Sequence, residues 1–232
     1  MQQQVEPARV RAPRLRDVRG VGIAASWAVC AVAVGDVVSA VGDWRTVRAL
    51  DGARSEAELA AVDRFNLIVG GVDLGLLAVA GVLFVVWLLR ARENSEFLCD
   101  AKHYYARSWA VFGWIVPVVG FWALCKYVQN VAVASDPSTE ARNAWIDHYK
   151  NKTVTRWWVL WILQHFAALL TFRAAAAAQD PYSSGGYGSV ALFSSISALL
   201  SCAGAVCAVL VIRSINRMQR FRRPIPWWHV AA

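Results

Sequence analysis

The sequence has few charged residues and none of the short motifs that mark common enzyme active sites. Only 17% of its 232 residues are charged, whereas 57% are hydrophobic, and this balance is too apolar for a single soluble core. The sequence contains no GxSxG nucleophile elbow, no Walker phosphate loop and no dinucleotide-binding glycine fingerprint. No reaction is therefore indicated, and we favour a non-enzymatic protein.

The cysteines and histidines do not form the patterns of a disulfide framework or a metal site. The five cysteines include no CxxC pair, and their odd number, with several in apolar segments, predicts free thiols. The four histidines include no pair at ligand spacing on one predicted helix, so we expect no zinc, no haem and no other cofactor.

Four long apolar segments dominate what is present. Each has about 20 residues, the length that an α-helix needs to cross roughly 30 Å of hydrocarbon. We predict an all-α integral membrane protein with one helical membrane domain (21–223), a basic and mobile N-terminal tail (1–20) and a C-terminal tail (224–232). The predicted spans are 21–41, 65–89, 154–172 and 190–212.

Tryptophan is abundant, with twelve copies. Indole rings prefer the boundary between headgroups and hydrocarbon. The ends of the predicted spans carry Trp44, Trp87, Trp157 and Trp158, and we therefore predict that these four side chains lie at the membrane surfaces.

A further apolar segment, residues 109–135, is interrupted near its middle by Pro117 and Gly120. Proline removes a backbone donor and disrupts the preceding turn, and a nearby glycine lets the backbone bend. We predict a re-entrant hairpin that enters the lipid and leaves by the same side, with Trp114, Pro117, Gly120 and Trp122 around its turn. The alternative is a kinked fifth transmembrane helix, since proline kinks occur in spanning helices.

The second half of this segment has an amphipathic pattern. Apolar residues recur there at helical spacing, whereas Lys126, Gln129 and Asn130 fall on other faces. This pattern is typical of a helix that lies in the membrane interface.

Two helix starts are indicated outside the apolar segments. Ser55 and Glu58 form a capping-box pattern, so the second helix should begin before its membrane span. Asp136 and Pro137 are typical of an N-cap and a first helical position, and they predict a short surface helix over 136–149.

The distribution of basic residues predicts the topology. Short loops rich in lysine and arginine remain cytoplasmic. Four spans place nineteen of the 24 lysines and arginines on the cytoplasmic side, whereas five spans place fewer than half there. We predict a multi-pass plasma-membrane protein with both termini cytoplasmic.

The same topology accounts for most of the net charge of +8, so no nucleic-acid partner is needed to explain it. A basic cluster follows the last span, where it can contact anionic lipid headgroups. Its members are Arg213, Arg217, Arg220, Arg222 and Arg223.

Polar residues inside the predicted spans are the candidate functional residues. An aspartate at membrane depth costs roughly 2.5–3.5 kcal/mol on insertion scales and normally faces protein or water. We predict a polar pocket that opens toward the outer face. The alternative is a buried hydrogen-bond cluster that fixes helix register. The predicted lining is Asp36, Asp73, Gln164, His165, Ser194, Ser197 and Ser201.

Several runs of residues resemble an actinobacterial family of membrane domains, domain of unknown function four-three-two-eight. They are Trp109–Pro117, Trp122, Ala134–Pro137 and Arg156–Trp161. The resemblance extends from the first span through the basic C-terminal helix. It implies a multi-pass membrane domain in an actinobacterial cell, and it implies no activity.

Three function classes follow from these patterns. We favour a non-enzymatic membrane module that binds a protein partner, a second copy of itself or an amphiphilic ligand. The second class is a small proton-coupled transporter or resistance protein that uses Asp36 and Asp73. The third is a membrane enzyme with His165 and an aspartate as acid and base, which requires His165 within about 3 Å of a carboxylate or in a water-filled cavity.

Overall fold

A computed structural model of the chain describes residues 15–52, 55–99, 103–115, 117–138, 150–178 and 186–221. These ranges contain helices and no strands, which confirms the all-α class. In chain order the helices are α1 (Arg19–Asp51), α2 (Glu56–Leu98), α3 (Trp109–Ile115), α4 (Pro117–Ser135), α5 (Lys152–Ala178) and α6 (Tyr187–Phe221).

Four helices, α1, α2, α5 and α6, are long and apolar enough to cross a membrane, which confirms the four predicted spans. Each extends beyond its predicted span at both ends. The longest is α2, whose 43 residues correspond to about 65 Å at 1.5 Å per residue. It begins directly after Ser55, as predicted, although the Ser55 side chain makes no capping hydrogen bond.

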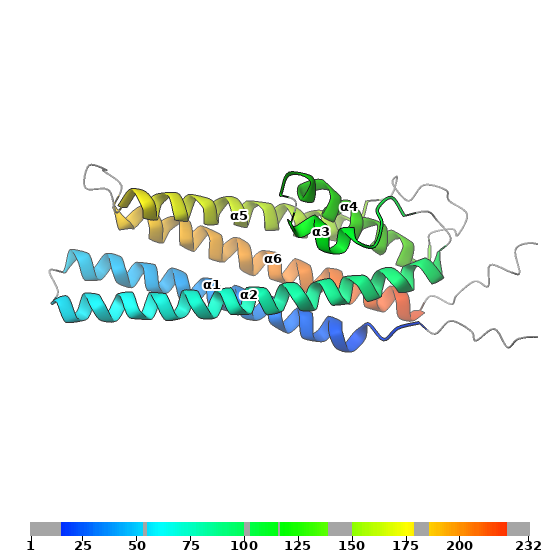
Figure 1. Ribbon diagram of the computed structural model, residues 1–232, viewed down its shortest axis with the longest axis horizontal. Helices are drawn as coiled ribbons and strands as arrows, with labels where there is room; N and C mark the ends of the chain where they lie inside the picture. Colours follow the sequence, from blue (N-terminus) through cyan, green and yellow to red (C-terminus); the bar gives the residue numbers. More distant parts are fainter. Residues whose placement is uncertain are drawn as a thin grey trace, which may run out of the picture.

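The four long helices form an open arc rather than a closed bundle. Helix α1 packs between α2 and α6, and α6 packs between α1 and α5 (Figure 1). Within the described ranges the backbones of the two outer members of the arc, α2 and α5, stay apart, and the side chains of Phe84 and Trp157 join them at the inner side. The flank between them is therefore open along part of its length.

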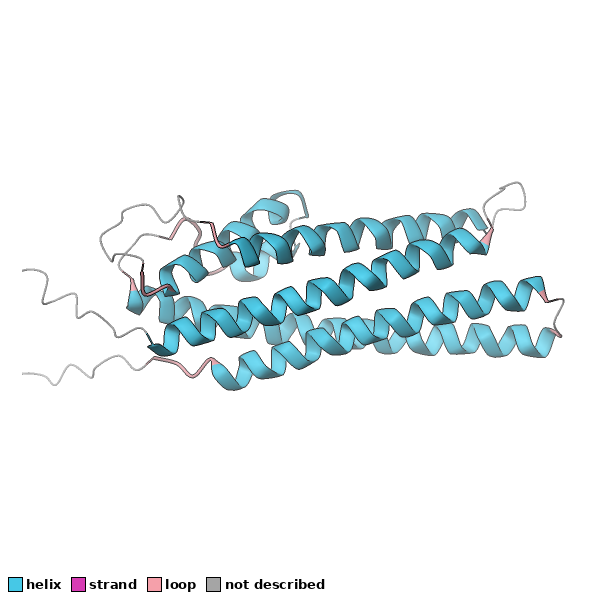
Figure 2. Cartoon of the chain, turned by 180° about the vertical axis from the view of Figure 1, so that it is seen from behind, coloured by secondary structure: helices cyan, strands magenta, loops and turns pink. Residues whose placement is uncertain are grey.

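Both described ends of the chain lie at one end of the arc (Figures 1 and 2). We call this the inner end, and we call the opposite end, where α1 leads to α2 and α5 leads to α6, the outer end. An even number of crossings gives this arrangement. The plasma membrane and the cytoplasmic location of the termini remain predictions.

The segment broken by proline forms two helices, α3 and α4, beside α5 near the inner end (Figure 1). Helix α4 begins at Pro117, because proline is compatible with a first helical turn and not with the interior of a continuous helix. The two helices approach so closely that a Cβ atom at Gly120 would overlap the carbonyl oxygen of Gly113. Entry of this pair into lipid remains a prediction.

The polar residues of α4 contact protein. Gln129 and Asn130 are buried, as is every other residue from Tyr127 to Ser135. Gln129 donates to the carbonyl oxygen of Asn151 and accepts from its backbone N–H. Helices α2, α5 and α6 all pack against α4, and its location in the membrane interface remains a prediction.

Three of the four boundary tryptophans are core residues instead. Trp87, Trp157 and Trp158 are each 5% exposed or less, whereas Trp44 is 42% exposed. The Trp87 indole donates to Asn216 at 2.9 Å, and that of Trp158 donates to the carbonyl oxygen of Phe121 at 2.9 Å. Protein acceptors therefore replace the headgroups that the sequence pattern suggested.

A buried amide network joins the elements at the inner end. Asn94 on α2 donates to Gln219 on α6 at 3.2 Å and to the carbonyl oxygen of Arg16 at 2.9 Å. Gln219 in turn donates to the carbonyl oxygen of Ala91 and to the hydroxyl of Ser135 on α4. We call this the inner-end lock, because it ties the N-terminal segment, α2, α4 and α6 together. The predicted surface helix over 136–149 and most of both tails lie outside the described residues.

Accessibility of single cysteines tests the sidedness. In a variant without the five native cysteines, we expect Asp51→Cys at the outer end to react with a membrane-impermeant maleimide in intact cells. Ser138→Cys at the inner end should react only after permeabilisation, because the distribution of lysine and arginine predicts a cytoplasmic inner end. Reaction of both cysteines from the same face would contradict the topology.

Candidate functional site

A cavity of about 370 Å³ lies within the arc and reaches α3. Its walls come from five helices, α1, α2, α3, α5 and α6. Six of the seven residues that the sequence places in a polar pocket lie on its surface, namely Asp36, Asp73, Gln164, His165, Ser197 and Ser201.

The two aspartates come together across the α1–α2 contact. Their carboxyl groups approach to hydrogen-bonding range, and Asp36 also accepts a hydrogen bond from Ser201. Gln164 on α5 lies 3.4 Å from Asp36, between Nε2 and Oδ2. Asp73 packs against the backbone of Gly35, where a Cβ atom would overlap its carboxylate.

His165 lies at the exposed side of the cavity. Its Nδ1 donates to the carbonyl oxygen of Trp161 at 2.8 Å, and its ring lies 4.0 Å from the Trp161 ring. Within the described residues His165 makes this hydrogen bond, and no hydrogen bond joins His165 to a carboxylate. The geometry that an acid–base pair requires is therefore not present in this arrangement.

Aromatic rings from α2, α3 and α5 form the remainder of the cavity wall. The Phe84 ring lies 6.0 Å from Trp114 and 5.4 Å from Trp157, measured between centroids. Trp114 lies 5.7 Å from Trp161. We call Phe84, Trp114, Trp157 and Trp161 the aromatic wall. The sequence patterns did not reveal it, because they place tryptophans at membrane boundaries.

The cavity changes from polar to aromatic along the bundle. Helix α2 runs toward the inner end, so its lining passes from Asp73 to Phe84. Helix α5 runs the opposite way, and its lining passes from Trp157 at the inner side to Gln164 at the outer side. The polar half therefore faces the outer end and the aromatic half faces α3.

The remaining predicted site residues, Ser194 and those of the hairpin, lie outside the polar half of the cavity. Ser194 is buried nearer the outer end, where it hydrogen-bonds with Asp43 rather than with the central pair. Of the hairpin residues, Trp114 lines the cavity, Gly120 contacts α3 and Trp122 is 69% exposed.

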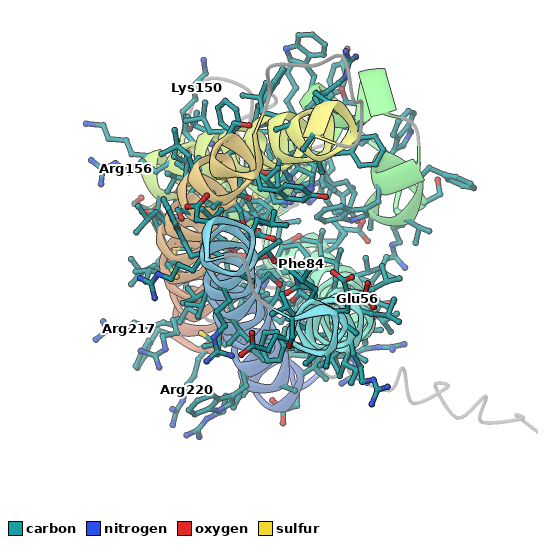
Figure 3. All side chains as sticks on the ribbon, turned by 90° about the vertical axis from the view of Figure 1, so that its left-hand side faces the viewer. Glu56, Phe84, Lys150, Arg156, Arg217 and Arg220 are labelled. Atoms are coloured by element: carbon teal, nitrogen blue, oxygen red, sulfur yellow. The ribbon has the colours of Figure 1, made fainter. Side chains whose placement is uncertain are left out.

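The basic cluster is on the surface where it is described. Arg213, Arg217 and Arg220 are exposed near the inner end of α6, and Figure 3 shows Arg217 and Arg220 pointing away from the bundle. Arg222 and Arg223 lie outside the described residues.

All five cysteines are free thiols. The described part of the chain contains no group of three or more histidine, cysteine or acidic side chains that could hold a metal ion.

A second ionisable cluster, which the sequence patterns missed, lies beside the inner-end lock. Arg92 is only 4% exposed, pairs with Glu96 at 2.8 Å, and has its guanidinium 5.3 Å from the centre of the Tyr127 ring. Burial first, and then the Arg92 charge, lowers the pKa of nearby His103 to about 4. This cluster stabilises the inner end and is separate from the cavity. No local sequence motif distinguishes it from surface charges.

Comparison with known proteins gives one family. A family model described as "Domain of unknown function (DUF4328)" matches residues 50–220, well over half of the chain. No curated protein and no solved structure matches the chain.

Replacing Gly35 tests the close contact with Asp73. We expect Gly35→Ala to destabilise the protein by about 1–3 kcal/mol, because the added methyl group overlaps Asp73 Oδ1 and displaces the carboxylate. Gly75→Ala on α2 is the matched control, since a Cβ atom there meets open space and alanine favours a helix over glycine. Thermal unfolding in detergent measures both, and equal Tm changes would contradict the packing of Asp73 on Gly35.

The buried imidazole predicts a pH dependence. The folded protein keeps His103 neutral down to about pH 4, whereas the unfolded chain protonates it near 6.5. Stability should therefore fall as the pH drops from about 6.5 to 4, by up to about 3 kcal/mol from this group. The free energy of unfolding of His103→Gln should lack this pH-dependent part. An identical pH dependence in both proteins would show that the His103 imidazole does not contribute to it.

Proposed function

This chain belongs to the DUF4328 family, and we propose that it is a membrane module that binds an amphiphilic molecule in the cavity between α2 and α5. The observation that supports this proposal is the order of the cavity lining, with two carboxyl groups, one amide and two serine hydroxyls in one half and the aromatic wall in the other. A ligand with one polar end and one apolar end matches that order.

The dimensions and lining of the cavity support a small-molecule ligand. Its volume of about 370 Å³ falls within the roughly 300–1,000 Å³ of ordinary ligand sites, which combine apolar walls with a few polar groups. A purely structural polar cluster would need no such space beside it. The aromatic wall offers contact area to a hydrocarbon body, and Gln164 and Ser201 offer hydrogen bonds to a polar end.

The open flank supports entry from the lipid. The backbones of α2 and α5 stay apart within the described ranges, so the cavity is open between the two helices away from the Phe84–Trp157 contact. The neighbouring surfaces of both helices are apolar, with Leu77 54% exposed on α2 and Leu169 49% exposed on α5. Such surfaces suit hydrocarbon tails, so an amphiphile dissolved in the bilayer would meet the opening directly.

The inner end offers a second kind of lipid contact. We propose that Arg213, Arg217 and Arg220 interact with anionic headgroups, which attract basic residues next to a spanning helix. Their exposure on one end of α6 supports this. The contact would anchor the inner end at the membrane surface.

Energy transfer to a neutral probe tests the ligand site. With the full chain in phosphatidylcholine nanodiscs, we expect N-dodecyl dansyl amide to quench tryptophan emission in a saturable way, because the aromatic wall lies in the cavity. Ala168→Phe should weaken this binding by at least tenfold, since Ala168 lines the cavity and a phenyl ring would occupy it.

Ala78→Phe is the matched control, because Ala78 is exposed on α2 and is not part of the cavity lining. This variant should bind the probe as the wild type does. Quenching that never saturates, or that both variants leave unchanged, would show dissolution of the probe in the bilayer and would refute the site.

A further inference from the structure

The charges in the cavity are unbalanced. Its described lining contains two carboxylates, Asp36 and Asp73, and no lysine or arginine. The histidine in that lining, His165, directs its Nδ1 hydrogen bond to the Trp161 carbonyl oxygen. Carboxylates in apolar surroundings require a partner of opposite charge or a shared proton. None of the described lining residues supplies a permanent positive charge.

The two carboxylates differ in how they are satisfied. Asp36 has Gln164 and Ser201 as hydrogen-bond partners. Asp73 has an oxygen, Oδ1, that is shielded from solvent and has no hydrogen-bond partner. Contact with Gly35 limits how far this carboxylate can turn away. Asp73 is therefore the less satisfied of the two carboxyl groups: Oδ1 lies against Gly35 without a donor, and Asp36 is its side-chain hydrogen-bond partner.

Aromatic rings suit the apolar body of an amphiphilic ligand. Large aromatic side chains offer broad apolar contact area. The aromatic wall lines the same cavity as the two carboxylates. A positive group between the aspartates could therefore have its apolar body covered by Trp114, Trp161 and Phe84.

We infer that the ligand of this cavity is an organic cation with an apolar body, held with its ammonium group between Asp36 and Asp73. This inference rests on the proposed function, because it names the chemical class of the amphiphile. It also gives the paired aspartates a role that a neutral amphiphile would not require. An ammonium group that donates hydrogen bonds to both carboxyl groups would balance one negative charge, which is the whole charge of the pair when the two carboxyl groups share a proton.

Competition between two matched amphiphiles tests the inference. At pH 7, dodecylammonium and dodecanol are each used to displace the neutral dansyl probe from the full chain in phosphatidylcholine nanodiscs. We expect dodecylammonium to compete at concentrations about 10- to 100-fold lower, as charge-assisted hydrogen bonds to Asp73 would give. Asp73→Asn should remove most of that preference and leave dodecanol competition unchanged.

Asp43→Asn is the matched control on α1, because Asp43 lies outside the cavity lining; it should keep the full preference for the amine. Unchanged dodecanol competition in Asp73→Asn also shows that the variant is folded. Equal competition by the two amphiphiles in the wild type would overturn the cation inference and leave the proposed function intact. Absence of saturable probe binding would refute the proposed function, and with it the inference.

Discussion

The inner-end lock is the constraint on which the rest of the arrangement depends. An arc of four helices whose outer members meet through side chains such as Phe84 and Trp157, and not along their backbones, has fewer packing surfaces than a closed bundle, so its ends must be held by other means. Gln219 and Asn94 join α6 to α2, and the Ser135 contact adds α4. Buried amides without partners would cost about 1–3 kcal/mol each, and this penalty favours the one arrangement in which all of them are paired.

With the inner end held, the remaining flank can stay open without loss of the fold. Helices α3 and α4 fill the space between the long helices near the inner end, and Trp114 closes that side of the cavity. Toward the outer end α2 packs mainly on α1, and Asp73 meets Gly35 there. The polar half of the cavity at mid-bundle therefore lies beside an open flank.

The spans and the polar residues could be predicted because membrane burial imposes simple rules. Apolar length alone located the four long helices, and the cost of a carboxylate in hydrocarbon singled out Asp36 and Asp73. The same rules misplaced Trp157 and Gln129. A tryptophan has the same sequence signature whether its indole meets a headgroup or a protein carbonyl. Likewise, the sequence predicts an exposed glutamine on a short helix, because it does not reveal a buried partner such as Asn151. Such contacts between distant segments leave no periodic signal.

The length of α2 has a mechanical consequence. Helix α2 is continuous over about 65 Å, and Asn94 holds it near its inner end. A tilt about that end therefore moves the outer end the most. A tilt of about 5° at the inner end would displace the outer end by roughly 6 Å by this geometry. Small rearrangements around the amides would therefore be amplified at the outer end of α2, together with α1 that packs on it.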